Sequence, residues 1–167
     1  MRKILAGFGS LLFLFLAPGT VAGLVPWWIS QGYMRPPFFD QFGFRIAGGI
    51  LIAVGLIPLL ESFVRFAWKG LGTPAPVFPT RHLVVSGFYR YVRNPMYLGV
   101  VAIILGEALL SGDAQLLIYA LLIWCGFFLF VLAYEEPILR ASFGEEYKTF
   151  CRNVPRWLPR LTPWQDS

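Results

Sequence analysis

Charged residues are scarce in this chain. Only 14% of its 167 residues are Asp, Glu, Lys or Arg, whereas 57% are hydrophobic, and the mean hydropathy is +0.63. A soluble domain of this length would need far more charge to cover its surface. The composition therefore excludes a soluble globular protein and predicts an integral membrane protein.

Cysteine and histidine are also rare. Cys125 lies within an uncharged apolar run and Cys151 in a polar tail, so we expect free thiols and no disulfide. These two thiols and one histidine are too widely separated for a zinc site built by the protein. No metal is predicted.

Signals of nucleotide and nucleic-acid binding are missing as well. Gly70 and Gly72 follow no strand and open no GxGxxG pattern, so they are not a nucleotide-binding fingerprint. The net charge of +5 does not indicate a nucleic-acid partner, because Lys and Arg flank apolar runs and do not cluster on one soluble face. Internal repeats are absent, and a single domain over residues 1–167 is predicted.

The chain instead has long apolar runs. A helix of about 20 apolar residues spans a bilayer, and four runs are near or above this length. The predicted fold is all-α, a polytopic integral membrane protein with about four transmembrane helices. Their expected ranges are 4–29, 42–68, 94–110 and 114–134.

The first run begins like a signal peptide, with basic Arg2 and Lys3 before an apolar core. Because the apolar character continues to Ile29, we predict a retained helix with a kink at Pro18. Gly19 and Gly23 have two equal interpretations. They let another helix approach closely, or they mark a flexible helix end.

Small residues also recur in the second run. They predict a stripe at which another helix packs closely, formed by Gly48, Gly49, Ala53 and Gly55.

Two glutamates, Glu61 and Glu107, lie near the ends of apolar runs. Glu61 either points into a polar cavity or pairs at the interface with Arg65, four residues later, and the pair is slightly favoured. For Glu107, placement at the interface and a functional role are equally open.

The charge distribution sets the expected orientation. Four spans place both termini on one side, and of the Lys and Arg residues only Arg35 and Arg45 lie near the other face. The positive-inside rule then makes both termini cytoplasmic, in a bacterial inner membrane. An amphipathic cytoplasmic helix is expected over 137–152, and the Pro-, Arg- and Trp-rich tail over 154–164 resembles an interfacial anchor.

Two polar stretches, 81–97 and 135–156, should meet at the cytoplasmic mouth of the bundle. They hold arginines and tyrosines, Tyr147 among them, and the adjacent carboxylates Glu135 and Glu136. A basic and aromatic interfacial belt explains them on composition alone. A ligand site is the alternative, because aromatic rings stack on purines and a carboxylate pairs with an ammonium. Such a site suits a cationic, zwitterionic cofactor better than a polyphosphate, since no phosphate-binding loop is present.

Two motifs decide between these interpretations. Residues 83–97 read LVVSGFYRYVRNPMY, and residues 135–147 read EEPILRASFGEEY, followed by Val154-Pro155. Both resemble the isoprenylcysteine carboxyl methyltransferase and phospholipid methyltransferase superfamily, over about residues 70–160. The first two spans match only in type. The resemblance favours an enzyme over a belt.

The resemblance implies a membrane enzyme that uses S-adenosylmethionine without a Rossmann domain, with a cytoplasmic cofactor region over 70–97 and 135–160. Because the sulfonium of this cofactor already activates the methyl group, no metal is required. Glu135 is expected to pair with the ammonium of the cofactor. Arg90, Arg93 and Glu136 are candidates for orienting the substrate, and no catalytic residue is assigned. The residues expected to bind the cofactor are Arg81, His82, Leu83, Val84, Tyr89, Asn94, Pro95, Met96, Tyr97 and Glu135.

Two positions depart from the family pattern. Asn94 stands where eukaryotic members carry histidine, and Val131 stands where prenylcysteine enzymes place an arginine for the substrate carboxylate. The resemblance implies methylation of a lipophilic acceptor from the bilayer, first of all an isoprenylcysteine-type carboxyl group. Val131 favours the first alternative, N-methylation of a phospholipid or other amine. The second alternative is a non-catalytic membrane transporter or assembly protein.

Overall fold

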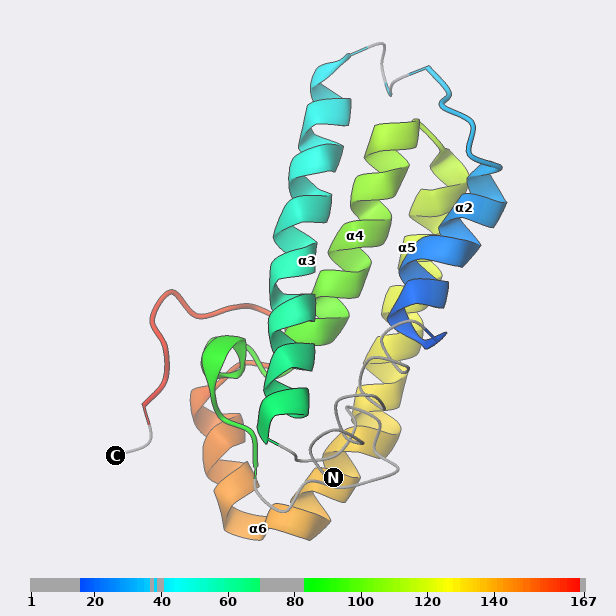
Figure 1. Ribbon diagram of the computed structural model, residues 1–167. Helices are drawn as coiled ribbons and strands as arrows, with labels where there is room; N and C mark the ends of the chain where they lie inside the picture. Colours follow the sequence, from blue (N-terminus) through cyan, green and yellow to red (C-terminus); the bar gives the residue numbers. More distant parts are fainter. Residues whose placement is uncertain (1–15, 37, 39–40, 70–82, 166–167) are drawn as a thin grey trace.

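We analysed a computed structural model of the chain, which describes residues 16–36, 38, 41–69 and 83–165 (Figure 1). These residues form helices and loops and contain no strand, so the all-α prediction is confirmed for them. In chain order the elements are η1 (Thr20–Leu24), α2 (Val25–Ser30), α3 (Gly43–Lys69), η3 (Gly87–Arg90), α4 (Pro95–Ser111), α5 (Ala114–Phe130), η4 (Val131–Glu135) and α6 (Glu136–Asn153).

Local sequence explains where α4 and α5 begin and end. Pro95 opens α4 with a φ angle already suited to the first helical turn. Gly112 ends α4 with a φ of 71°, a left-handed conformation that favours glycine. Asp113 then caps α5, because its side chain accepts a hydrogen bond of 2.9 Å from the backbone N–H of Gln115.

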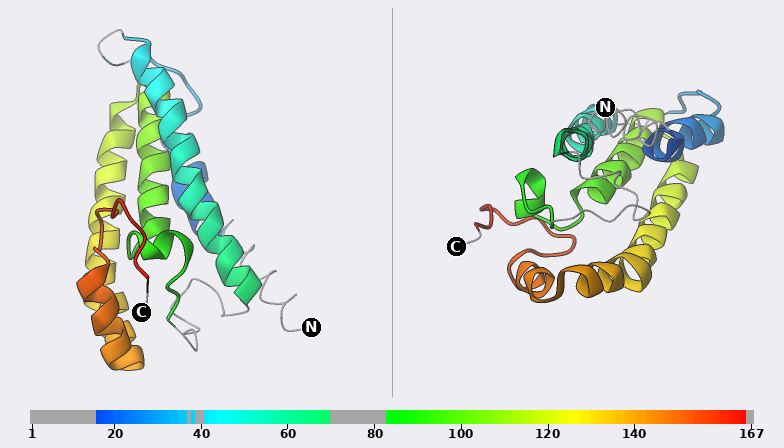
Figure 2. Two further views of the ribbon diagram at one scale, coloured as in Figure 1. Left: turned by 90° about the vertical axis from the view of Figure 1, so that its left-hand side faces the viewer. Right: turned by 60° about the horizontal axis from the view of Figure 1, so that its bottom comes forward.

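Among the described residues, two helical segments are long and apolar enough to cross a membrane, Gly43–Arg65 and Ala114–Asn153. Thr20–Ser30 and Pro95–Ser111 are apolar but shorter, so four spans remain a prediction. A helix of 40 residues is about 60 Å long, twice the hydrocarbon thickness of a bilayer. Only its apolar part, up to about Tyr134, can therefore lie in the membrane. The charged α6 bends away from α5 (Figures 1 and 2).

Helix α4 lies between α3 and α5 (Figure 1). Its contact with α3 is close enough for the two backbones to touch. A Cβ on Gly99 would lie 2.6 Å from the carbonyl oxygen of Gly55, and one on Gly48 would lie 2.6 Å from that of Gly106. On each helix the two glycines are one heptad apart and so share a face. Small residues permit this approach, and no larger side chain fits there.

The predicted stripe of small residues is half right. Gly48 and Gly55 form the contact with α4, but Gly49 is exposed, and a Cβ added there would have no atom within 4 Å. Ala53 is also exposed. The pattern of small residues was correct, whereas the helical face assigned to these two was wrong.

At the start of the described chain, the structure does not support close helix approach, one of the two interpretations left open for Gly19 and Gly23, and the kink is not at Pro18. A Cβ on Gly23 would have no atom within 4 Å and Gly19 is exposed, so no described helix approaches closely there. The non-helical residue of η1 is Ala22, four positions after the kink predicted at Pro18. Residues 4–15 of the predicted range 4–29 lie outside the described residues.

We predict that Gly99→Ala destabilises the protein. The added methyl group would overlap the Gly55 carbonyl, and such overpacking costs about 1–3 kcal/mol. Gly49→Ala is the matched control, because Ala is favoured over Gly by about 1 kcal/mol in a helix and no atom opposes it there. Thermal unfolding in detergent should rank Gly99→Ala below the wild type and Gly49→Ala at or above it. Equal melting temperatures for the two variants would contradict the close contact.

Candidate functional site

The first motif is shaped by Gly87, the first residue of η3. Its φ is +59°, and a Cβ would overlap the side chains of Glu61 and Arg65 at the end of α3. Glycine is therefore required both by conformation and by space. Glu61 and Arg65 form the i,i+4 ion pair favoured by the sequence analysis, and this pair supports the loop.

The tail after α6 runs along the first motif. The backbone N–H of Trp164 donates to the carbonyl of Arg90, that of Arg160 donates to Tyr91, and that of Arg93 donates to Pro155, each over 2.9 Å. Buried Asn94 also donates from Nδ2 to the carbonyl of Arg156 over 3.2 Å. The tail thus holds the motif in place, a role that the sequence analysis did not assign to it.

A buried carboxylate ties these segments together. Glu136 is 4% exposed. Its carboxylate accepts hydrogen bonds from Arg93 Nη1 (3.0 Å), Arg140 Nη2 (3.3 Å), and Arg156 Nε (2.6 Å) and Nη2 (3.0 Å). Burial by itself would raise the pKa of Glu136, but the hydrogen bond from Arg156 and the charges of the three guanidinium groups outweigh burial and hold the pKa below its usual range. Glu136 is therefore an ionised link between the first motif, α6 and the tail.

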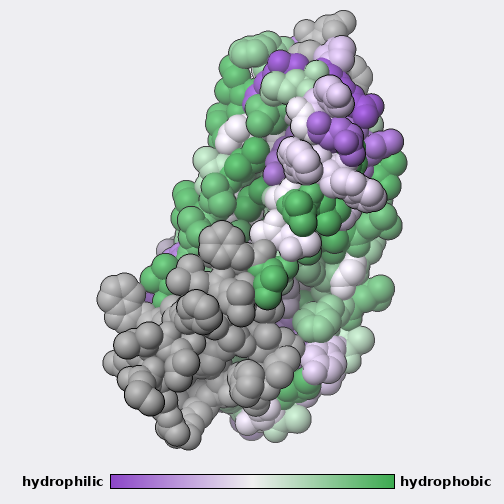
Figure 3. Space-filling model, turned by 45° about the vertical axis from the view of Figure 1, so that its right-hand side comes forward, coloured by the Kyte–Doolittle hydropathy of each residue, from purple (hydrophilic) through white to green (hydrophobic). Residues whose placement is uncertain are grey.

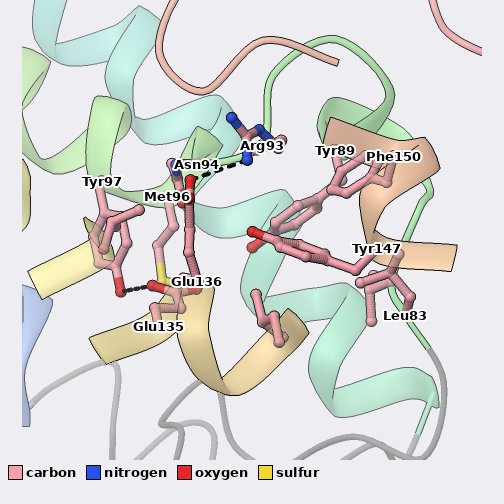
Figure 4. Close-up of a pocket in the computed structure, with 13 residues that line it drawn as sticks. Leu83, Tyr89, Arg93, Asn94, Met96, Tyr97, Glu135, Glu136, Tyr147 and Phe150 are labelled. Atoms are coloured by element: carbon pink, nitrogen blue, oxygen red, sulfur yellow. Dashed lines mark hydrogen bonds and ion pairs between the residues drawn. The ribbon is translucent and has the colours of Figure 1, made fainter. Parts of the chain in front are cut away.

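A cavity of about 100 Å³ lies beside this cluster, between the start of α4, the π-helical segment η4 and α6 (Figure 4). Its lining consists of Leu83, Val84, Tyr89, Arg93, Asn94, Met96, Tyr97, Val131, Glu135, Glu136, Leu139, Tyr147 and Phe150. The segment η4 brings both Val131 and Glu135 to the cavity. π-Helical turns often mark functional sites.

Glu135 differs from its neighbour Glu136 in its partners. Its Oε2 accepts a hydrogen bond of 2.9 Å from the hydroxyl of Tyr97. Figure 4 shows this pair on one side of the cavity, with Tyr147 and Phe150 on the other. Within residues 16–36, 38, 41–69 and 83–165, Glu135 makes no ion pair. An acidic group of this kind suits a cationic ligand.

Two further tyrosines, the half-buried Tyr89 and the buried Tyr147, line the cavity. Burial raises the pKa of Tyr89 well above its usual range, and burial likewise raises the pKa of Tyr147. Both hydroxyls therefore remain protonated at neutral pH. Each ring lies at the cavity and offers an aromatic face to a molecule there.

Most residues predicted to bind the cofactor line this cavity. Pro95 is an exception, because it lines an apolar groove on the other side of the motif, between α3 and α4. Arg81 and His82 lie outside the described residues. The predicted residues at the cavity are Leu83, Val84, Tyr89, Asn94, Met96, Tyr97 and Glu135.

The three candidates for orienting the substrate have different surroundings. Arg93 and Glu136 line the cavity but bind one another. Arg90 does not line it, and its Nε donates to the carbonyl of Trp164 over 2.6 Å. The structure thus gives Arg90 a role in holding the tail.

The sequence analysis missed Leu139 and Phe150 as cavity residues. Both lie on the apolar face of α6 together with Tyr147, at helical spacing. This spacing was visible in the sequence. It does not tell which neighbour the face covers, so it could not place the two residues at the cavity.

The sequence profile of the phospholipid methyltransferase family matches residues 44–146, more than half of the chain. The chain belongs to the phospholipid methyltransferase family. This confirms the resemblance drawn from the two motifs. The match also begins further upstream than the motifs, at the second residue of α3, and so includes nearly all of that helix. Family membership and the two long apolar helices together indicate a membrane protein.

Individual relatives carry names of two kinds of methyltransferase. A protein-S-isoprenylcysteine O-methyltransferase B of Arabidopsis thaliana is 31% identical over 80% of this chain and 60% of that protein. A protein-S-isoprenylcysteine O-methyltransferase of Schizosaccharomyces pombe is 36% identical over 47% of this chain and 34% of its own length. A phosphatidylethanolamine N-methyltransferase of Laccaria bicolor is 29% identical over 68% of this chain and 13% of that protein. The chain thus spans between about an eighth and three fifths of the length of these relatives. No solved structure matches it significantly.

We predict that Glu136→Gln lowers stability by about 3 kcal/mol at pH 7, because it leaves the partly buried guanidinium groups of Arg93 and Arg156 without a countercharge. The folded-state pKa of Glu136 lies below the unfolded value, so its stabilisation is present above the unfolded pKa and is lost as the pH falls through the folded pKa. The difference in melting temperature between wild type and variant should therefore shrink between about pH 5 and pH 3.

Glu146→Gln is the matched control, since Glu146 is an exposed residue of the same helix. It should melt close to the wild type across this pH range. A constant difference for Glu136→Gln at every pH would show that the ion pairs do not stabilise the fold.

Proposed function

We propose that the protein transfers a methyl group from S-adenosylmethionine to a lipophilic acceptor. The observation that carries this proposal is Glu135, a carboxylate without an ionic partner among the described residues, at a cavity lined by the family's first motif. Family membership and the methyltransferase names of the relatives support it. The acceptor, the cofactor and the roles of single residues are parts of this proposal.

The side chains at the cavity fit such a cofactor. Glu135 would hold the ammonium group of its methionine part, and Tyr97 fixes the position of Glu135 by the bond to Oε2. Tyr89 and Tyr147 offer aromatic faces for the adenine. Ligand pockets usually measure about 300–1,000 Å³, so a molecule of this size would extend out of the 100 Å³ that the described residues enclose.

The cofactor would supply a methyl group that its sulfonium already activates. What remains for the chain is to align the acceptor and to exclude water. Leu139, Val131 and Phe150 form the apolar part of the wall and keep water away from the reacting groups. The network of Glu136 with the arginines keeps α6 against the first motif, so that this wall stays closed.

The membrane topology is part of the proposal. We place four spans in a bilayer with both termini and the cavity at the cytoplasmic face, as the distribution of Lys and Arg favours. A lipid-linked acceptor would then reach the cavity sideways from the bilayer. A bacterial inner membrane fits this arrangement.

For the acceptor, the names of the relatives favour an isoprenylcysteine-type carboxyl group. Buried Val131 supplies no positive charge at the cavity, which supports the alternative of an amine acceptor. Arg93 can replace the missing cation for a carboxyl acceptor. It lines the cavity, and its Nε is buried without a hydrogen-bond partner in the described chain.

We expect S-adenosylhomocysteine to bind the detergent-purified full chain in calorimetry, and Glu135→Gln to weaken binding at least tenfold, or about 1.4 kcal/mol. The lost contact is a charge-assisted hydrogen bond to the ammonium. Glu146→Gln should bind like the wild type, because its carboxylate is exposed on α6. Absence of binding to the folded wild type would exclude the enzyme and leave a transporter or assembly protein.

We further expect radiolabelled methyl groups to appear on the carboxyl group of an S-farnesylated cysteine offered in mixed micelles. A methyl ester is cleaved by alkali and releases volatile methanol, whereas an N-methyl group survives. The farnesyl cysteine methyl ester serves as the control, because its carboxyl group is blocked. Alkali-stable label on phosphatidylethanolamine, with none on the acid, would instead establish the amine alternative.

A further inference from the structure

A second pocket lies at the end of the bundle opposite α6. It measures about 200 Å³ and lies between α2, the loop after it, the end of α4 and the start of α5. Its residues are Gly23, Pro26, Trp27, Ser30, Gly32, Tyr33, Met34, Glu107, Leu110, Ser111 and Leu116. Polar side chains gather around this end of the molecule, above a largely hydrophobic surface (Figure 3).

This pocket is separate from the methyl-transfer cavity. Tyr97 and Glu107 lie about 15 Å apart along the axis of α4, and the two cavities share no lining residue. The predicted topology places the second pocket near the opposite membrane surface. Its ligand therefore does not have to be the cofactor or the acceptor.

Glu107 is the ionisable group of this pocket. In the part of the chain that the structure describes, its carboxylate makes no hydrogen bond or ion pair, and its Oε2 is buried. The arginines of the same end have other partners. Arg35 lies 3.2 Å from the carboxylate of Asp113, and Arg45 donates to the carbonyl of Arg35 over 2.7 Å. A carboxylate with a buried oxygen and no partner among the described residues calls for an explanation, and a bound cation supplies one.

The other side chains of the pocket define which cation fits. Trp27 and Tyr33 are exposed rings at its edge, with 62% and 73% of their surfaces accessible. Aromatic faces together with a carboxylate are typical of sites for organic ammonium groups. The hydroxyls of Ser30 and Ser111 already donate to backbone carbonyls, at Trp27 and Glu107 respectively. The pocket therefore favours a cation over an anion.

We propose that this pocket binds an organic ammonium group, held by the carboxylate of Glu107 and the rings of Trp27 and Tyr33. Two sources share this chemistry, the headgroup of an ethanolamine or choline phospholipid and a free amine. The pocket lies at the surface of a membrane protein near the end of α4, where either source has access.

The test uses the full chain in detergent and choline chloride as the probe, with sodium chloride at equal ionic strength as the blank. Calorimetry should show saturable binding to the wild type, at least tenfold weaker binding to Glu107→Gln, and unchanged binding to Glu146→Gln. Glu107→Gln keeps the size of the side chain and removes a buried charge, so it should fold. Tyr33→Leu, at an exposed position, provides a second variant and should weaken binding several-fold.

A second experiment distinguishes the sources. Melting temperatures are compared in nanodiscs of phosphatidylethanolamine, phosphatidylcholine and phosphatidylglycerol. If phosphatidylethanolamine and phosphatidylcholine raise the melting temperature of the wild type but not of Glu107→Gln, the site binds a lipid headgroup. If choline binds but neither lipid raises the melting temperature, the site binds a free amine. Either result supports the proposal. No binding in both experiments, or equal binding by Glu107→Gln, overturns it. Binding of S-adenosylhomocysteine should stay unchanged in Glu107→Gln, so the two proposals fail independently.

Discussion

The site depends on the burial of one carboxylate, that of Glu136. Removing a carboxylate from water is costly, and here three guanidinium groups from three parts of the chain offset the cost. The same bonds fix α6 and the tail against the first motif. They also engage Arg93, Arg140 and Arg156, so that none of these arginines forms an ion pair with the adjacent Glu135 in the described chain. Two neighbouring glutamates thus have opposite roles, because their environments differ.

A second constraint is the contact between α3 and α4. Gly48 and Gly55 on one helix meet Gly106 and Gly99 on the other, with no side chain between the backbones. Such an interface cannot shift without creating overlaps, so α4 is a rigid element. Its first turn carries Met96 and Tyr97 to the cavity, and its last turns carry Glu107 to the second pocket. One helix therefore fixes the position of both.

The sequence predicted those parts of the structure that depend on local signals. The helical ranges 42–68 and 94–110 agree with α3 and α4 within one residue, because apolar runs, Pro95 and Gly112 mark them. Glu135 and most of the first motif were placed by resemblance. The tail was not, since most of its bonds to residues 90–93 join backbone groups, and the bond from Arg90 Nε ends on a backbone carbonyl, so they leave no pattern of paired side chains. Gly49 and Ala53 were misassigned because composition does not define the phase of a helix.

The charges of the cavity bear on the choice between acceptors. The negative charge of Glu136 stays balanced by Arg140 and Arg156 even if Arg93 also binds the carboxylate of an acceptor. With Glu135 engaged by an ammonium group, a sulfonium would add positive charge beside the acceptor. An anionic acceptor is drawn to that charge and to Arg93, whereas a protonated amine is repelled and must first lose its proton. Under the proposed function, Val131 gives the cavity one cation fewer than prenylcysteine enzymes are expected to have, while Arg93 and the sulfonium would still attract a carboxylate acceptor.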